Sequence, residues 1–171
     1  MFNEIFVVVD TSRSMRKSSS LSAEQAVIKK LHKELISSPK DPFFKKITYY
    51  RCGDDKLVVQ GNTLWVPAYV DCAKTAPIIS SLKTTVFDAL LSSQGQKRAV
   101  IVLSDGFWCG KREDLIEFEF SCYAQMPGRV LIAEINLGGN TLYNLKHPKS
   151  LKLQGDRDDL AEIIETAVKN M

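Results

Sequence analysis

The chain lacks the features that would place it in a membrane or mark it for export. Its 171 residues contain no run of about 18 apolar residues, so no segment is expected to span a membrane. The first residues do not form a basic stretch followed by an apolar one, as a secretory signal would. We therefore expect a cytoplasmic protein with no membrane partner.

The chain also lacks clusters of like charge, and it lacks pairs of metal-binding or catalytic residues. The formal net charge is +3, and basic and acidic residues are mixed along the chain, which argues against a nucleic-acid partner. Neither of the two histidines lies in a motif or beside a candidate nucleophile, so we do not expect an enzyme. The four cysteines form no C-x-x-C pair, which argues against a zinc site and favours reduced thiols.

Alternating strand and helix patterns run through the sequence. Hydrophobic residues make up 44% of the chain, enough for the core of one domain of this length. Apolar runs predict strands, and apolar stripes at helical spacing predict helices between them. The expected strands are 4–10, 46–52, 97–104, 129–135 and 150–153, and the expected helices are 22–36, 71–82, 84–93, 113–123 and a last one capped by Asp156 or Asp158.

A hairpin signal interrupts this alternation. Residues 56–60 and 63–69 flank Gly61-Asn62, a pair typical of a tight turn between antiparallel strands. One segment within 56–70 is therefore expected to form an antiparallel edge strand. We predict a single domain over residues 1–171 with a doubly wound, Rossmann-like α/β fold. Its sheet would have six mostly parallel strands, one antiparallel edge strand, and helices on both faces.

Polar segments follow two of the predicted buried strands. Residues 10–14 (Asp-Thr-Ser-Arg-Ser) come directly after the apolar run 5–9, and Asp105 comes after the run 99–103. Ligands bind at this carboxyl edge in open α/β sheets. Hydroxyl and carboxylate oxygens are ligands that suit Mg²⁺ or Mn²⁺. With Thr84 at the start of a predicted helix, the sequence predicts one metal site made by Asp10, Ser12, Ser14, Thr84 and Asp105.

The segment after the first strand, residues 11–20, is rich in serine and predicts a loop. Its beginning contains no glycine. A dinucleotide site needs a glycine-rich turn there, so that the backbone can approach pyrophosphate, and a phosphate cradle is therefore disfavoured. Asp10, Ser12 and Ser14 are instead spaced two residues apart, and alternate side chains of an extended loop point the same way.

Together these segments resemble the metal-ion-dependent adhesion site (MIDAS) of the von Willebrand factor A (VWA) family. The family's first element, D-x-S-x-S, matches residues 10–14, and its T/S-D-G turn matches residues 104–106. Its middle element is a threonine followed five residues later by Ala-Leu, which matches Thr84 and Ala89-Leu90. The resemblance covers essentially the whole chain, which looks like the stand-alone intracellular VWA proteins of bacteria.

The resemblance implies a protein-interaction module. In the family, one coordination position of the metal is left for an Asp or Glu from another protein. An ion held by hydroxyls and only two acids keeps an attraction for such an anion. Arg13, Phe107 and Trp108 flank the loops and are the expected partner-binding residues. By analogy with similar domains, the setting would be a tellurite-resistance-like stress-response system.

Two other interpretations stay open. A Mg²⁺-dependent phosphohydrolase of this topology would carry D-x-D after the first strand, where this chain has Ser12 in place of the second aspartate. A scaffold with a vestigial metal site would bind its partners through other surfaces. Metal titration distinguishes the metal-dependent interaction module from the scaffold, and a phosphatase assay distinguishes the module from the enzyme.

Overall fold

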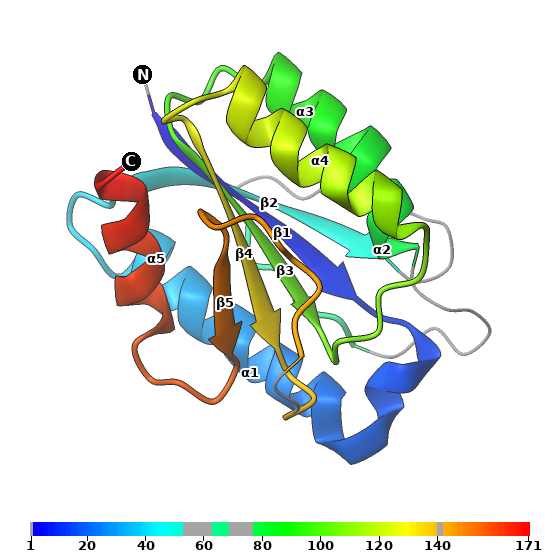
Figure 1. Ribbon diagram of the computed structural model, residues 1–171. Helices are drawn as coiled ribbons and strands as arrows, with labels where there is room; N and C mark the ends of the chain where they lie inside the picture. Colours follow the sequence, from blue (N-terminus) through cyan, green and yellow to red (C-terminus); the bar gives the residue numbers. More distant parts are fainter. Residues whose placement is uncertain (1, 53–62, 69–76, 140–141) are drawn as a thin grey trace.

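Five parallel strands form the centre of the molecule (Figure 1). The computed structural model describes residues 2–52, 63–68, 77–139 and 142–171. The strands are β1 (Asn3–Asp10), β2 (Phe44–Cys52), β3 (Arg98–Ser104), β4 (Val130–Asn136) and β5 (Leu151–Gln154). They are ordered β2-β1-β3-β4-β5, and every adjacent pair is parallel. The carboxyl ends of all five strands therefore meet at one edge of the sheet.

Helices cover both faces of this sheet. They are the 3₁₀ helix η1 (Arg13–Ser19), α1 (Ser20–His32), the π-helical turn η2 (Lys33–Ser37), α2 (Ile78–Ser81), the π-helical turn η3 (Leu82–Val86), α3 (Phe87–Ser92), α4 (Arg112–Gln125) and α5 (Leu160–Lys169). The helices α1 and α5 lie on one face, and α2, α3 and α4 lie on the other (Figure 1). In the described ranges, no helix is long and apolar enough to cross a bilayer.

Alternation along β1 divides the hydrophobic core in two. Ile5, Val7 and Val9 pack toward α1 and α5, whereas Phe6 and Val8 pack toward α2, α3 and α4. Successive side chains of a strand point to opposite faces, so a strand covered on both faces must be apolar throughout. This explains why the buried strands are continuous apolar runs.

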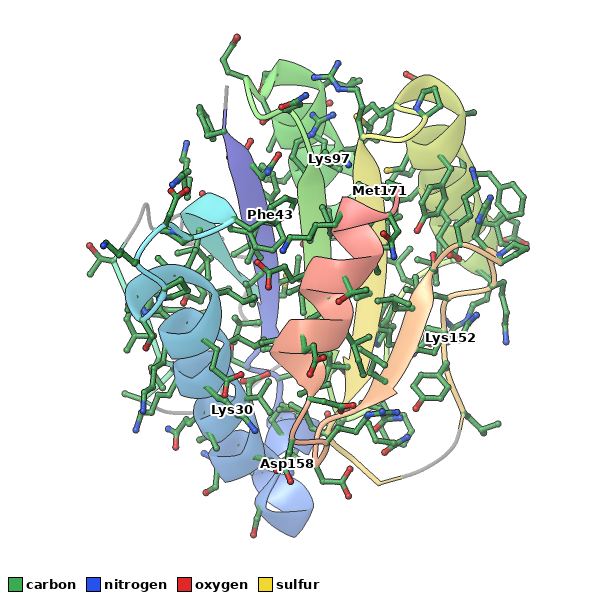
Figure 2. The ribbon with its side chains drawn as sticks, turned by 90° about the vertical axis from the view of Figure 1, so that its left-hand side faces the viewer. Lys30, Phe43, Lys97, Lys152, Asp158 and Met171 are labelled. Atoms are coloured by element: carbon green, nitrogen blue, oxygen red, sulfur yellow. The ribbon has the colours of Figure 1, made fainter. Side chains whose placement is uncertain are left out.

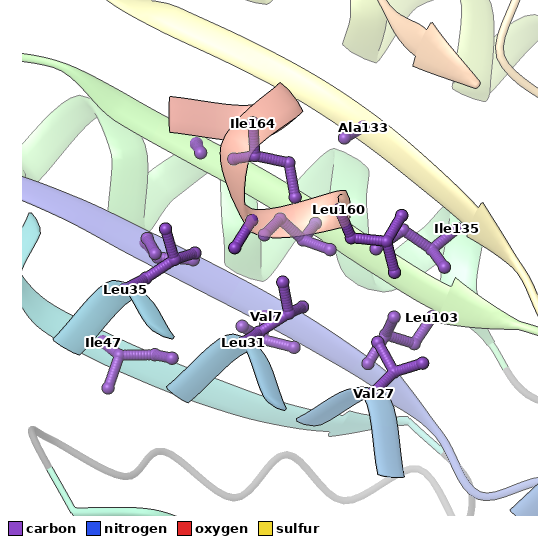
Figure 3. Packing of buried hydrophobic residues seen from close by; sticks show 14 of the residues in the cluster. Val7, Val27, Leu31, Leu35, Ile47, Leu103, Ala133, Ile135, Leu160 and Ile164 are labelled. Carbon is purple, nitrogen blue, oxygen red and sulfur yellow. The ribbon is translucent and has the colours of Figure 1, made fainter. Parts of the chain in front are cut away.

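On the face of the sheet that α1 and α5 cover, both helices pack apolar side chains against the strands. Figure 3 shows Leu31 of α1 beside Val7, and Leu160 of α5 among the strand residues. Full burial of such a side chain contributes about 1.5–3 kcal/mol. At the surface of this face, Lys30 of α1 lies 3.7 Å from Asp158, before α5 (Figure 2).

The strands predicted from apolar runs are all present, within one or two residues of their expected ends. The described sheet has five strands and no antiparallel pair. Residues 63–68 contain no strand, and residues 53–62 and 69–76 lie outside the described ranges. The sixth, antiparallel strand within 56–70 therefore stays a prediction.

Two expectations about helices are wrong. The sequence predicts a loop over residues 11–20, but 13–19 form η1. It also predicts a new helix beginning at Thr84, but one continuous helical stretch runs through α2, η3 and α3, from Ile78 to Ser92. Apolar side chains on this stretch are fully buried at helical spacing, and the sequence between them contains no Gly or Pro to end the helix.

Candidate metal and partner-binding site

The parallel pairing of β1 with β3 brings two of the predicted loops together. Val9 of β1 pairs with Leu103 of β3, so Asp10 and Ser104 follow side by side at the carboxyl edge. Asp10 is the last residue of β1, and Asp105 is the first residue after β3. The loops that carry the two aspartates therefore start from neighbouring strand ends.

Asp10 is the fixed centre of this region, with none of its surface exposed (0%). One carboxylate oxygen, Oδ1, accepts a hydrogen bond from the backbone N–H of Ser12 at 2.8 Å. The other, Oδ2, accepts one from the hydroxyl of Ser104 at 3.0 Å. Burial raises the pKa of Asp10 to about 6, the hydrogen bonds from Ser12 and Ser104 lower it, and the charge of Asp105 raises it further.

The hydroxyls of Ser12 and Ser14 lie 3.1 Å apart, oxygen to oxygen. Ser12 is buried and Ser14 is half-buried, at the point where η1 begins. Two ligands at about 2.1 Å from Mg²⁺ and at a right angle to each other are about 3.0 Å apart. The spacing of the two hydroxyl oxygens therefore suits adjacent positions on an octahedral ion.

Asp105 sits in a tight turn that needs glycines around it. Its Oδ1 accepts the backbone N–H of Phe107 at 3.2 Å, and Gly106 has a φ of +105°. A Cβ on Gly138 would lie 2.4 Å from the carbonyl oxygen of Asp105, so only glycine fits there. The loop after β4 thus packs directly against the backbone of the aspartate loop.

Thr84 is placed differently from the other predicted ligands. It is exposed in the middle of the helical stretch, and its hydroxyl donates to the carbonyl of Ser80 at 2.8 Å. In the described part of the chain, no hydrogen bond joins Thr84 to the other predicted ligands. The helix starts at Ile78, and the threonine that precedes this start in the sequence, Thr75, lies outside the described ranges.

The three residues expected at the partner-binding rim separate into two groups. Arg13 is exposed, and Phe107 is 72% exposed beside Asp105. Trp108 is only 3% exposed and belongs to the core under α2 and α4. Trp108 therefore does not lie on the exposed rim, because the chain turns its indole inward as it leaves the aspartate loop.

Sequence reasoning missed two polar residues at this edge. Ser104 donates to Asp10 and also accepts the backbone N–H of Gly106 at 3.1 Å. Glu24 of α1 is completely buried (0% exposed), and among the described residues neither of its carboxylate oxygens has a hydrogen-bond partner. Its position was detectable, since Glu24 falls at helical spacing on the buried stripe of α1 with Val27 and Leu31.

Glu24 is electrically coupled to the two aspartates. Burial raises its pKa well above the usual value, and the charges of Asp10 and Asp105 raise it further. The backbone N–H of Asp10 faces the carboxyl and offsets part of this increase, without reaching the geometry of a full hydrogen bond. Glu24 is thus a buried acid whose surroundings disfavour its charged form.

Carboxylates alone do not form a metal site in this region. In residues 2–52, 63–68, 77–139 and 142–171, no group of three or more His, Cys, Asp or Glu side chains is arranged to hold a metal ion. Cys52 of β2 pairs with Asp10 of β1 and is a buried thiol. Burial raises the pKa of Cys52 to about 12. A cation at this edge would depend on the Ser12 and Ser14 hydroxyls together with the aspartates.

Comparison with known proteins gives a fold relationship. No family model matches the chain, and no curated protein matches it. It is similar in structure to proximal thread matrix protein 1 (PTMP1) from the mussel byssus, with a TM-score of 0.58 and 17% identity over 99% of this chain and 45% of that one. The vWF domain of the type V pili tip protein Mfa5 from Porphyromonas gingivalis aligns at a TM-score of 0.49 and 10% identity, over 99% of this chain and 94% of that domain. The chain thus spans less than half of PTMP1, and the two share an α/β fold.

Proposed function

We propose that this protein is a VWA-type protein-interaction module whose MIDAS-type metal site binds an Asp or Glu carboxylate from a partner protein. The ion is Mg²⁺ or Mn²⁺. Asp10, Ser12, Ser14 and Asp105 hold it directly or through water, and Thr84 is the fifth ligand expected from the sequence pattern. A tellurite-resistance-like stress-response system is the proposed setting, by analogy only.

The observation that carries this proposal is the pair of serine hydroxyls beside a buried acid. Ser12 and Ser14 place two oxygens 3.1 Å apart, next to Asp10, whose carboxylate is already oriented by Ser104. Hydroxyl ligands add no charge, so the ion would keep an attraction for an external carboxylate. Burial and the charges of the two aspartates raise the pKa of Glu24, which disfavours a third negative charge near the ion.

Calorimetry with MnCl₂ tests the proposal. The wild type is expected to bind one ion, and Asp10→Ala and Ser12→Ala are expected to weaken binding by about tenfold or more, since each removes a ligand or its support. Asp41→Asn is the matched control, because Asp41 is an exposed acid in the loop before β2, at the opposite edge of the sheet. Equal Mn²⁺ binding by wild type and Asp10→Ala would overturn the assignment.

The position of Thr84 gives the vestigial-scaffold alternative its support, because its hydroxyl is engaged within its own helix. Absence of any Mn²⁺ heat in the wild type would favour that alternative. The phosphohydrolase alternative is tested with p-nitrophenyl phosphate and Mg²⁺. Turnover that disappears in Asp10→Asn would establish the enzyme and overturn the interaction module.

A further inference from the structure

A groove of about 490 Å³ lies directly beside the Asp105 loop. Its walls come from that loop, from the start of α4 and from the segment that follows β4. The residues that line it are Gly106, Phe107, Arg112, Leu115, Ile116, Leu142, Tyr143, Asn144 and Lys146. Because Gly106 and Phe107 directly follow Asp105, one wall of the groove begins next to a proposed metal ligand.

The groove gathers exposed apolar side chains. Phe107, Ile116 and Leu142 all line it, and Phe107 and Leu142 are 72% and 79% exposed. Buried Leu115 forms part of its floor. Single exposed apolar residues need no explanation, but a cluster around a concave site marks a binding surface.

The charge of the groove has one sign. Among the described residues that line it, Arg112 and Lys146 are the charged ones, and none is an acid. Arg112 donates from Nη1 to the side-chain oxygen of Asn144 at 2.7 Å, and Lys146 is exposed. A partner that places acidic residues over this rim gains favourable charge contacts.

Buried carboxylates hold the wall of the groove in place. Glu134 of β4 accepts the backbone N–H of Asn144 at 2.7 Å and its side-chain N–H at 2.9 Å. The Asn144 side chain also donates to the carbonyl of Gly106 at 3.1 Å, which ties this segment to the aspartate loop. Glu119 of α4 accepts the backbone N–H of Lys146 at 2.7 Å. The groove is therefore formed before any partner arrives, and binding need not order its wall.

We propose that this groove receives a large apolar side chain from an acidic linear segment of the partner protein. The segment would place one carboxylate at the metal, its apolar side chain between Ile116 and Leu142, and further acids near Lys146. This deepens the proposed function by naming the partner chemistry, and it rests on that function for the position of the metal-bound carboxylate.

A random peptide library displayed on phage, selected on the full biotinylated chain with MnCl₂ present, tests the inference. Enriched sequences are expected to combine a large apolar residue with several Asp or Glu residues. Synthetic fluorescein-labelled copies of them are then titrated by anisotropy. Ile116→Ser, Leu142→Ser and Lys146→Glu are each expected to weaken binding by about tenfold or more.

Matched controls lie on other surfaces. Leu91→Ser changes an exposed leucine of α3, and Lys29→Glu changes an exposed lysine of α1; both are expected to bind like wild type. No enriched peptide, enriched peptides without acids, or groove variants that bind like wild type would overturn the inference.

The metal and the groove fail in distinguishable ways. Loss of peptide binding in Asp10→Ala or EDTA, with groove variants unaffected, would support the metal site and overturn the groove. Loss in the groove variants, with Asp10→Ala and EDTA without effect, would support the groove and overturn the metal-dependent function.

Discussion

Buried acids at the two edges of the sheet have different charged neighbours. At the amino edge, Glu4 of β1 is almost fully buried, yet Lys46 lies 4.0 Å away and the hydroxyl of Ser93 donates to it. At the carboxyl edge, Glu24 and Asp10 are buried without an ion pair to any Lys or Arg in the described residues. Among the described residues, a lysine therefore lies beside the buried acid at one edge, whereas no Lys or Arg forms an ion pair with the buried acids at the other.

The pKa shifts at the two edges express this difference. Burial raises the pKa of Glu4, and the charges of Lys46 and Arg98 offset part of this increase. For Glu24, burial is followed by the charges of Asp10 and Asp105, which push the pKa in the same upward direction. A buried charge is tolerated when it is paired, and an unpaired one is costly. An external cation would therefore offset more unfavourable charge at the carboxyl edge than at the amino edge.

The largest expected effect comes from removing the buried glutamate at each edge. Glu4→Leu leaves the buried Arg98 and the Lys46 charge uncompensated and is expected to lower the free energy of unfolding by about 3 kcal/mol. Glu24→Leu removes a carboxyl that has no hydrogen-bond partner among the described residues, and it is expected to raise this free energy by about 1–3 kcal/mol. Urea unfolding at neutral pH in EDTA measures both, and a loss of stability in both variants would break the comparison.

The next effect is the pH dependence of the metal-free protein. Burial raises the pKa of Asp10 from 3.8 to about 6, so the folded state holds this proton more tightly than the unfolded state. The stability it contributes is complete below about pH 4 and is lost as pH rises through about 6, a change of about 3 kcal/mol. Glu24, whose pKa is also raised, contributes in the same direction.

Urea unfolding in EDTA, at acidic and at neutral pH, measures this change. Asp10→Asn keeps the shape of the side chain and is expected to remove about 3 kcal/mol of the pH dependence. Millimolar MnCl₂ is expected to restore stability to the wild type at neutral pH, because an ion that binds only the folded state stabilises it. Identical pH profiles for wild type and Asp10→Asn would contradict the buried, charge-coupled position of Asp10.

The strands and the position of the first loop are predictable from the sequence because their signals are local. Apolar runs such as 5–9 and 99–103 can be buried on both faces only as central parallel strands. Polar residues that directly follow such runs must then lie at the carboxyl edge, which is where the structure has Asp10 and Asp105. The adjacency of β1 and β3, which no local signal encodes, brings the two loops side by side.

The remaining parts of the site depend on packing that a motif does not encode. The spacing from Thr84 to Ala89-Leu90 fits the family pattern, but buried Ile78, Ile79 and Leu82 begin the helix earlier. Pro77 at the N-cap is the available signal, since proline is favoured at helix starts. Trp108 shows the same limit, because nothing in the sequence decides which of two neighbouring aromatics turns into the core.

The smallest expected effect concerns Thr84, the fifth proposed ligand. Thr84→Ala is expected to weaken Mn²⁺ binding by about tenfold, or 1.4 kcal/mol, because it removes one hydroxyl ligand. Thr85→Ala is the matched control, since it makes the same change at the next residue of η3, and it is expected to leave binding unchanged. Calorimetry on both variants measures the difference. The hydroxyl of Thr84 donates to Ser80 within its own helix, so weaker binding in Thr84→Ala alone would also require this hydroxyl to turn toward the ion. Equal binding by Thr84→Ala and wild type would remove Thr84 from the site.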